Sequence, residues 1–223
     1  NEPVSWQNIV WKSRLPQALT ALAAGAGLAV SGLQMQTVFR NPLAGPSVLG
    51  ISSGASMGVA FVILLSGSLG GVALSRLGVM GEIALSVAAI IGSLSVMALI
   101  VYVSQKVRGN VTLLIIGVMI GYVSNAVIGV LKFFSVEEDI RAYVIWGLGS
   151  FSRVSGNQMM LFVTLMAISL PLSFLLIKTL NLMLLGDGYA RNVGLNIKRA
   201  RLLVIVWAGV LTPIVTAYRG PII

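Results

Sequence analysis

The sequence predicts an all-α polytopic membrane protein, on three observations. Hydrophobic residues make up 57% of the 223 residues and charged residues only 9%, whereas a soluble domain carries about 25% charge. Mean hydropathy is +0.97. The charges also lie in bands that leave uncharged stretches of 17 to 35 residues, and about 20 apolar residues cross a bilayer core as a helix. We therefore expect about six spans in one domain over 1–223, near 16–38, 48–66, 83–105, 111–132, 157–178 and 202–218.

Lysine and arginine indicate which side of the membrane each connector faces. Six spans place alternate connectors on opposite sides, and one set holds eight of these residues against about six in the other. Short connectors rich in Lys and Arg lie in the cytoplasm, so we assign the first set, which includes residues 184–201, to that side. The net charge of +9 is thus a topology signal. We expect contact with membrane lipids and no nucleic-acid partner.

The segment before the first span combines aromatic with basic residues. Trp6 and Trp11 lie beside Lys12 and Arg14, a combination typical of membrane–water interfaces. We expect an interfacial strip on the outer side. Pro16 then fits the first turn of the helix that follows.

Several predicted spans carry small residues at four-residue spacing. Such faces let helix backbones approach closely where lipid supplies no hydrophobic driving force. We expect most of them to pack inside the subunit and the rest to line a transport path or a dimer interface. The residues are Ala21, Gly25 and Ala29, Gly54 and Gly58, and Gly117 and Gly121.

Residues 41–56, NPLAGPSVLGISSGAS, interrupt the membrane pattern. Pro42 and Pro46 cannot lie inside an ordinary helix without removing backbone hydrogen bonds, and Ser52 and Ser53 add hydroxyls to an apolar run. Broken backbone at membrane depth is tolerated where it is buried in protein or lines a wet cavity. The segment is either a plain turn between two spans or a constriction at the cytoplasmic end of a transport path.

The connector between the fourth and fifth spans, VEEDIRAYVIWGLGSFSR, is long for a hairpin loop. We expect a short outer-surface helix or a re-entrant turn, with an amphipathic stretch that ends at Trp146. Its acidic residues either contact a soluble partner or are solvated.

Residues 184–201, LLGDGYARNVGLNIKRAR, form a polar connector between two apolar runs. Asp187 is suited to cap a helical turn, and Gly194 suits the C-terminal end of that turn. Asn196 then begins a second short helix. Two short helices meeting at a turn would form a rigid surface for a soluble partner, and a merely solvated loop is the alternative.

The sequence offers little chemistry inside the membrane. None of its six acidic residues lies in the middle of a predicted span, and it has no histidine or cysteine. Ion-coupled carriers commonly need an intramembrane carboxylate, which disfavours the first alternative, a secondary transporter or channel. A second alternative, a membrane-embedded enzyme, lacks a catalytic pair. We expect no catalytic residue, no metal site and no cofactor, and the absence of a nucleotide-binding motif assigns any energy source to another chain.

Four segments together resemble the permease subunits of type II ATP-binding-cassette importers, which take up iron–siderophore chelates, haem and cobalamin. They occur in the family's order and cover nearly the whole chain: residues 14–55, WGLGSFS at 146–152, GDGYARNVGLNIKRAR at 186–201 and GPI at 220–222. As a set they are highly specific. The resemblance implies a transport subunit of the bacterial inner membrane and not an enzyme.

The resemblance also implies partners. Family permeases have about ten spans and work as homodimers or pseudo-dimers, with two ATPase subunits below and a periplasmic or lipoprotein substrate-binding protein above. ATP and Mg would then belong to the ATPases. By this comparison the chain lacks the family's first span and its last three, so we expect truncation at both ends.

Site residues follow from the motifs and the resemblance. The expected ATPase-coupling residues are Gly186, Asp187, Ala190, Arg191, Gly194, Arg199 and Arg201. The expected pathway and gate residues are Asn41, Pro42, Leu43, Ala44, Ser52 and Ser53. The expected docking residues for the binding protein are Arg14 and, in place of the family's second arginine, Lys12, because Gln17 stands at that second position. Gly45 and Arg219 also depart from the family's pattern.

Overall fold

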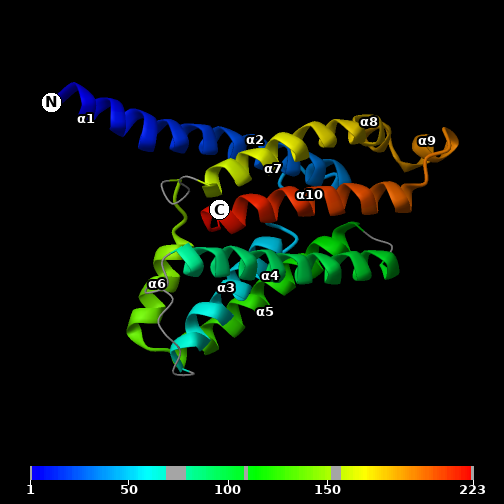
Figure 1. Ribbon diagram of the computed structural model, residues 1–223. Coiled ribbons are helices and arrows are strands. Elements are labelled where there is room, and N and C mark those ends of the chain that lie inside the picture. Colours follow the sequence, from blue (N-terminus) through cyan, green and yellow to red (C-terminus); the bar gives the residue numbers. More distant parts are fainter. Residues whose placement is uncertain (1, 69–78, 108–109, 152–156, 222–223) are drawn as a thin grey trace.

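The computed structural model describes residues 2–68, 79–107, 110–151 and 157–221. Within these ranges the regular elements are helices, with no strand (Figure 1). The helices are α1 (Glu2–Ile9), α2 (Leu15–Phe39), α3 (Ile51–Ser68), α4 (Val79–Lys106), α5 (Asn110–Phe133), α6 (Glu137–Gly147), α7 (Asn157–Ser173), α8 (Ile177–Leu184), α9 (Asp187–Asn192) and α10 (Ile197–Arg219). A π-helical turn, Val10–Arg14, joins α1 to α2, and a 3₁₀ turn, Phe174–Leu176, joins α7 to α8. The predicted all-α class is confirmed.

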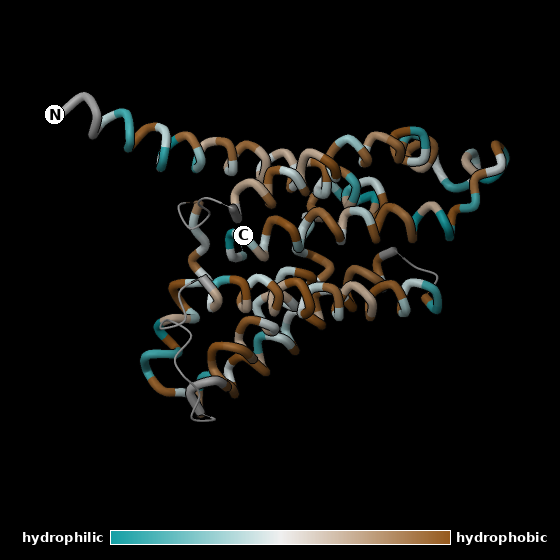
Figure 2. The backbone as a smooth tube through the Cα atoms, viewed as in Figure 1, coloured by the Kyte–Doolittle hydropathy of each residue, from teal (hydrophilic) through white to brown (hydrophobic). Residues whose placement is uncertain are grey.

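The predicted spans fall on apolar helices. Five described segments are long and apolar enough to cross a membrane: Trp6–Phe39, Met80–Lys106, Val111–Phe133, Met159–Leu184 and Ile197–Arg219. A shorter apolar helix, Ile51–Leu65, occupies the second predicted span. Hydrophobic residues run along these helices in Figure 2. The chain is a multi-pass membrane protein.

The N-terminal segment is continuous with the first span. α1, the π-helical turn and α2 run on without a break, and Figure 1 shows this long helix projecting past the other helices at its N-terminal end. Pro16 lies in the first turn of α2, as predicted. Proline lacks an N–H and its ring clashes with the carbonyl four residues earlier, so the wider turn at Val10–Arg14 accommodates it. The interfacial placement of Trp6 and Trp11, which are both exposed, stays a prediction.

α10 lies at the centre of the bundle. Of its most apolar stretch, 61% is buried, against 22% for α5. It packs against α2, α3, α4 and α7 (Figure 1), and its buried side chains include Val204, Ile205 and Leu211. Because α10 begins directly after the polar connector, the most buried of the membrane helices also leads to the most polar part of the chain.

Small residues bring the backbones of α3 and α4 into contact. A Cβ on Gly54 would lie 2.7 Å from the carbonyl oxygen of Gly92, and a Cβ on Gly58 would meet the carbonyl of Ala88. A larger residue at either position requires the helices to move apart. The predicted packing role of this pair is confirmed. Gly25 differs, because a Cβ there would have nothing within 4 Å.

The connector between α5 and α7 contains the predicted short helix, α6. Tyr143 and Trp146 are buried in a cluster with side chains of α3. The expectation of a solvated acidic loop is wrong for Asp139, which is buried and has one carboxylate oxygen without a partner among the described residues. Burial, and then the neighbouring Glu138 carboxylate, raise the pKa of Asp139 above its ordinary value. Glu138 itself is exposed.

Candidate coupling site

The connector between α8 and α10 contains one short helix, α9, which is terminated by a glycine two residues after its end. Gly194 follows α9 with a φ of +92°. The Gly194 N–H donates to the Arg191 carbonyl at 2.9 Å, and the Leu195 N–H donates to the Ala190 carbonyl at 2.9 Å. These two bonds form a Schellman motif, which needs a left-handed residue that glycine supplies without steric cost. The predicted helix end at Gly194 is confirmed.

Two details of the connector differ from the prediction. Asp187 is the first residue of α9 and caps nothing, because Gly186 occupies the cap position at a φ of +107°. The expected second short helix is the beginning of α10, a single helix of 23 residues. Asn196 does cap it, since its side-chain oxygen accepts from the Arg199 N–H at 3.2 Å. A cap marks where a helix begins and carries no information about its length.

The interrupted segment before α3 forms a tight turn at the same end of the bundle. Arg40 ends α2 in the left-handed region, with a φ of +49°. The Asn41 side-chain oxygen accepts from the Leu43 N–H at 2.9 Å, and the Asn41 carbonyl accepts from the Ala44 N–H at 3.0 Å. Ala44 is buried and Leu43 is 87% exposed. Asn41 therefore holds the turn, and the turn presents a leucine outward.

An ion pair joins this turn to the connector. Arg40 Nη2 lies 2.6 Å from Asp187 Oδ1 and also donates to the Met183 carbonyl at 3.4 Å. The two charged side chains are 47% and 36% exposed, so the pair contributes only on the order of 0–1 kcal/mol to stability. A contact of this strength positions α9 against the end of α2 without locking it there.

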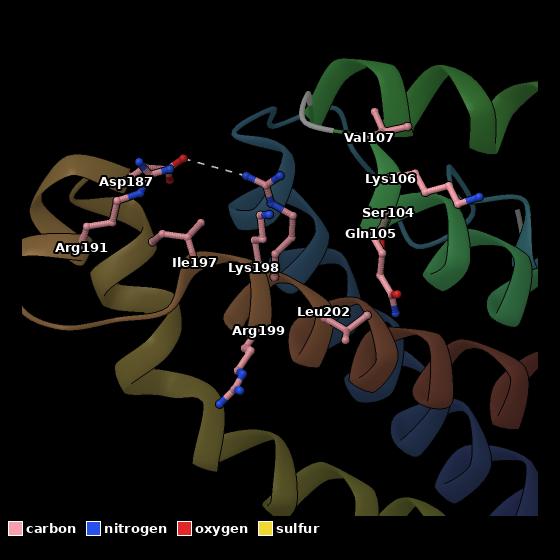
Figure 3. Close-up of a pocket in the computed structure, with 11 residues that line it drawn as sticks. Ser104, Gln105, Lys106, Val107, Asp187, Arg191, Ile197, Lys198, Arg199 and Leu202 are labelled. Carbon is pink, nitrogen blue, oxygen red and sulfur yellow. Dashed lines mark ion pairs between the residues drawn. The ribbon is translucent and has the colours of Figure 1, made fainter.

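Four of the expected coupling residues line one cleft. The cleft has a volume of about 610 Å³ and lies between α9, the start of α10 and the end of α4 (Figure 3). Asp187, Arg191, Arg199 and Arg201 line it, whereas Ala190 is buried. The structure thus gathers residues of two helices onto one polar surface. The sequence did not predict that residues at the end of α4 would line the same cleft.

The expected pathway residues do not form one lining. Ser52 faces a cavity of about 190 Å³ together with Thr212 of α10. Ser53 faces a different cavity of about 210 Å³ beside Gly117 of α5. Neighbouring residues of a helix point about 100° apart, which explains the separation. Residues 41–44 remain together at the turn.

The expected docking residues lie away from the connector. Lys12 and Arg14 are exposed on the π-helical turn before α2, at the end of the first helix opposite to α9 (Figure 1). Their docking role stays a prediction.

Arg40 is the contact residue that sequence reasoning missed. It is separated from Asp187 by 147 positions along the chain, so no local pattern connects the two. One signal was available: Asp187 is the only acidic residue in the connectors assigned to the cytoplasm, among eight basic residues. A lone carboxylate in such surroundings is expected to pair with a cation.

Known proteins match nearly the whole chain. The model of the FecCD transport family matches residues 2–223. The hemin transport system permease protein HmuU of Yersinia pestis is 34% identical, covering 97% of this chain and 62% of that protein. The vitamin B12 import system permease protein BtuC of Serratia proteamaculans is 36% identical, with the same coverage. The probable iron chelatin transport system permease protein of Helicobacter pylori is 36% identical, covering 96% of this chain and 61% of that protein.

The fold also matches a solved structure, described as a metal-chelate type ABC transporter in an inward-facing conformation. The TM-score is 0.85 at 30% identity, with 99% of this chain and 67% of that chain covered. The chain spans about 62% of the length of the curated relatives HmuU and BtuC. Its apolar helices and permease relatives indicate a multi-pass protein of the bacterial inner membrane. With a match that extends from residue 2 to residue 223, the chain belongs to the FecCD transport family.

Proposed function

We propose that the chain is the membrane-spanning permease part of an ATP-binding-cassette importer for iron chelates, haem or cobalamin. Family membership supports a transport role, and relatives named for hemin, vitamin B12 and iron chelatin support these substrate classes. The observation that carries the proposal is the Arg40–Asp187 contact, which links the interrupted segment to the connector. The permease supplies the path and breaks no bond of the substrate.

The partners follow from this function. ATPase subunits dock on α9 and bind ATP and Mg²⁺, so the permease holds no cofactor of its own. A periplasmic or lipoprotein binding protein docks at the opposite end, near Lys12 and Arg14, and the permease works as a homodimer or pseudo-dimer. The exposure of Tyr189 and Val193 on the connector supports α9 as the docking surface, because apolar side chains turned to water favour a partner.

Coupling passes from α9 to the turn at residues 41–44. Movement of the ATPases displaces α9, and the Arg40–Asp187 contact carries this displacement to the end of α2 and to Leu43. The exposure of both charged side chains supports this route, since a solvated ion pair breaks and re-forms at low cost. α10 provides a second route, because it runs from the connector into the centre of the bundle.

Co-purification of the ATPase with the complete transporter tests the docking role of α9. The double substitution Tyr189→Asp, Val193→Asp places charges where a partner would bury apolar groups, so we expect the ATPase to be lost while the spans still insert. Deletion of residues 186–194 should act in the same way. Phe134→Asp is the control, because Phe134 is exposed directly after α5, and the α5–α6 end of the bundle lies away from α9 (Figure 1). Full ATPase binding by the double variant would contradict the docking role.

Arg40→Gln separates coupling from docking. It removes the ion pair and leaves Tyr189 and Val193 in place, so the ATPase should co-purify while chelate uptake falls by up to about fivefold, the factor that corresponds to about 1 kcal/mol. Lys178→Gln, which changes a cation of α8 outside the pair, should transport normally. Normal uptake by Arg40→Gln would exclude this route of coupling.

Uptake by the unmodified transporter that survives ATP depletion but collapses with the ion gradient would favour the alternative, a secondary transporter or channel.

A further inference from the structure

The cleft beside the connector carries an excess of positive charge. Five basic side chains line it: Lys106, Arg191, Lys198, Arg199 and Arg201. Asp187 is the one acidic residue of the described lining, and its Oδ1 is already engaged by Arg40 from α2. Like charges gathered in one cleft repel each other. The lining therefore lacks a compensating anion among its described residues.

Arg201 is the least exposed of these five basic side chains. Its side chain is 18% exposed, and its Nη2 reaches Asp187 Oδ2 only at 3.9 Å, which is too long for a hydrogen bond. Its Nε is buried and has no hydrogen-bond partner in the part of the chain that the structure describes. A buried donor without an acceptor is destabilising, and a guanidinium matches a phosphate with two parallel donors. The Arg201 Nη2, which Asp187 approaches only at that long distance, is the donor that a phosphate in the cleft would engage.

The first turn of α10 adds further positive potential to the same cleft. Unpaired N–H groups make a helix N-terminus electropositive, and Asn196 accepts from one of them, that of Arg199. The turn contains no acidic residue to balance Lys198 and Arg199. Figure 3 shows Lys198 between Asp187 on α9 and Gln105 at the end of α4. A helix N-terminus surrounded by cations is suited to bind a phosphate.

The position of the cleft indicates where the phosphate comes from. The cleft lies where two membrane-crossing helices, α4 and α10, reach the side assigned to the cytoplasm. Val107, Ile197 and Leu202 add apolar lining beside the charges. Tyr102 lies one helical turn before Lys106 on α4 and is exposed, and the Lys106 ammonium lies 4.5 Å from its ring centroid. Long basic side chains near the end of a membrane helix adopt such positions when their charge extends toward the headgroup layer. Basic pockets between membrane helices on this side bind anionic headgroups.

We propose that this cleft binds the phosphate group of an anionic phospholipid. The phosphate accepts hydrogen bonds from Arg201 and contacts Lys198, and the acyl chains extend along the exposed side of α4, which carries Leu99 and Tyr102. The bound headgroup neutralises the repulsion between the basic side chains and holds α9 and the start of α10 beside α4. The site goes beyond the proposed transport function, because it assigns the connector a ligand of its own.

Native mass spectrometry of the complete transporter, delipidated in detergent, tests the site. The protein is titrated with phosphatidylglycerol, with phosphatidylcholine and with inorganic phosphate. We expect selective retention of phosphatidylglycerol, and binding at least about tenfold weaker in the double variant Arg201→Gln, Lys198→Gln. Lys198→Arg keeps the charge and should bind as the unmodified protein does. Lys178→Gln is the matched control, since Lys178 lies at the same end but not in the cleft.

The same titrations show whether the phosphate comes from a lipid or from solution. They also include the outcomes that would contradict the proposal. Displacement of the lipid by inorganic phosphate, with the same dependence on Arg201, supports the phosphate site and makes its ligand soluble. Equal retention of both lipids, or equal binding by the double variant, overturns the proposal. So does loss of the ATPase by the double variant without any lipid selectivity, which assigns the cleft to an acidic protein surface. The Tyr189→Asp, Val193→Asp protein should bind phosphatidylglycerol normally, so failure of the docking role and failure of this site are separable.

Discussion

The two ends of α10 each carry an arginine, in opposite surroundings. Arg201 lies near the start of the helix, lines the open cleft and approaches Asp187. Arg219, the last residue of the helix, is fully buried, and none of its three side-chain nitrogens has a hydrogen-bond partner among the described residues. Its guanidinium lies over the rings of Phe151 at 4.5 Å and Phe162 at 5.2 Å. One end of the central helix is open and polar, and the other is closed by aromatic rings.

This difference indicates which end of α10 can respond to a partner. At the open end the charges are partly solvated, so ion pairs can exchange at little cost. At the closed end, the Ser150 N–H donates to the Arg219 carbonyl at 2.9 Å, and Gly220 packs directly on the carbonyl of Trp146. Moving this end would break those contacts and leave a buried charge without its aromatic neighbours. α10 is therefore anchored at one end and adjustable at the other.

Gly220→Ala should have the largest effect on this arrangement. Gly220 has a φ of +80° and a ψ of 173°, a region that essentially only glycine occupies. An added Cβ would also lie 2.5 Å from the Trp146 carbonyl oxygen. Strain and overlap together should lower the free energy of unfolding by about 3 kcal/mol or more, measured by thermal or denaturant unfolding of the complete permease in detergent. A loss below about 1 kcal/mol would show that the closed end is loosely packed.

Arg219→Met should have a smaller effect of the opposite sign. Burial of an unpaired guanidinium destabilises the fold by several kcal/mol, whereas each contact with an aromatic face stabilises it by about 0.5–2 kcal/mol. An apolar side chain of similar length fills the same space without the charge, so the permease should become more stable by about 1–2 kcal/mol. The control is Arg199→Met at the open end, where the side chain is exposed and solvation keeps the change within about 0.5 kcal/mol.

Destabilisation by Arg219→Met would contradict this account. It would mean that the complete protein supplies an anion to Arg219, and an acidic residue brought next to the guanidinium would then be detectable by crosslinking. A double-mutant cycle with Phe162→Leu separates the two explanations. Coupling between Arg219 and Phe162 of about 0.5 kcal/mol or more is expected if the aromatic rings provide the stabilisation.

The open end of α10 was more predictable from the sequence than the closed end. Bands of charge located the spans, and the helix end at Gly194 and the cap at Asn196 depend on residues that are neighbours along the chain. The contacts of Arg219 with Phe162 and of Arg40 with Asp187 join distant positions, so they follow from the packing of whole helices. Local patterns do not contain that information.

The same distinction explains the buried carboxylate. Asp139 stands in an acidic run that is typical of a solvated loop. Its burial arises because α6 packs against α3, which composition does not reveal. The resemblance to importer permeases identified the connector and the interrupted segment as a set, but the Arg40–Asp187 ion pair that joins them appears only in the folded chain.

Gly194→Ala should have the smallest effect and completes the comparison with Gly220→Ala. Both glycines have a positive φ next to an end of α10, but a Cβ on Gly194 would meet nothing within 4 Å. The backbone strain alone should lower the free energy of unfolding by about 1–2 kcal/mol, and Gly194→Asn should cost less, because asparagine tolerates this conformation. A loss as large as that of Gly220→Ala would show that the connector is packed against the bundle. A small loss would mean that local hydrogen bonds determine the shape of α9, which leaves its outer surface free to bind a partner.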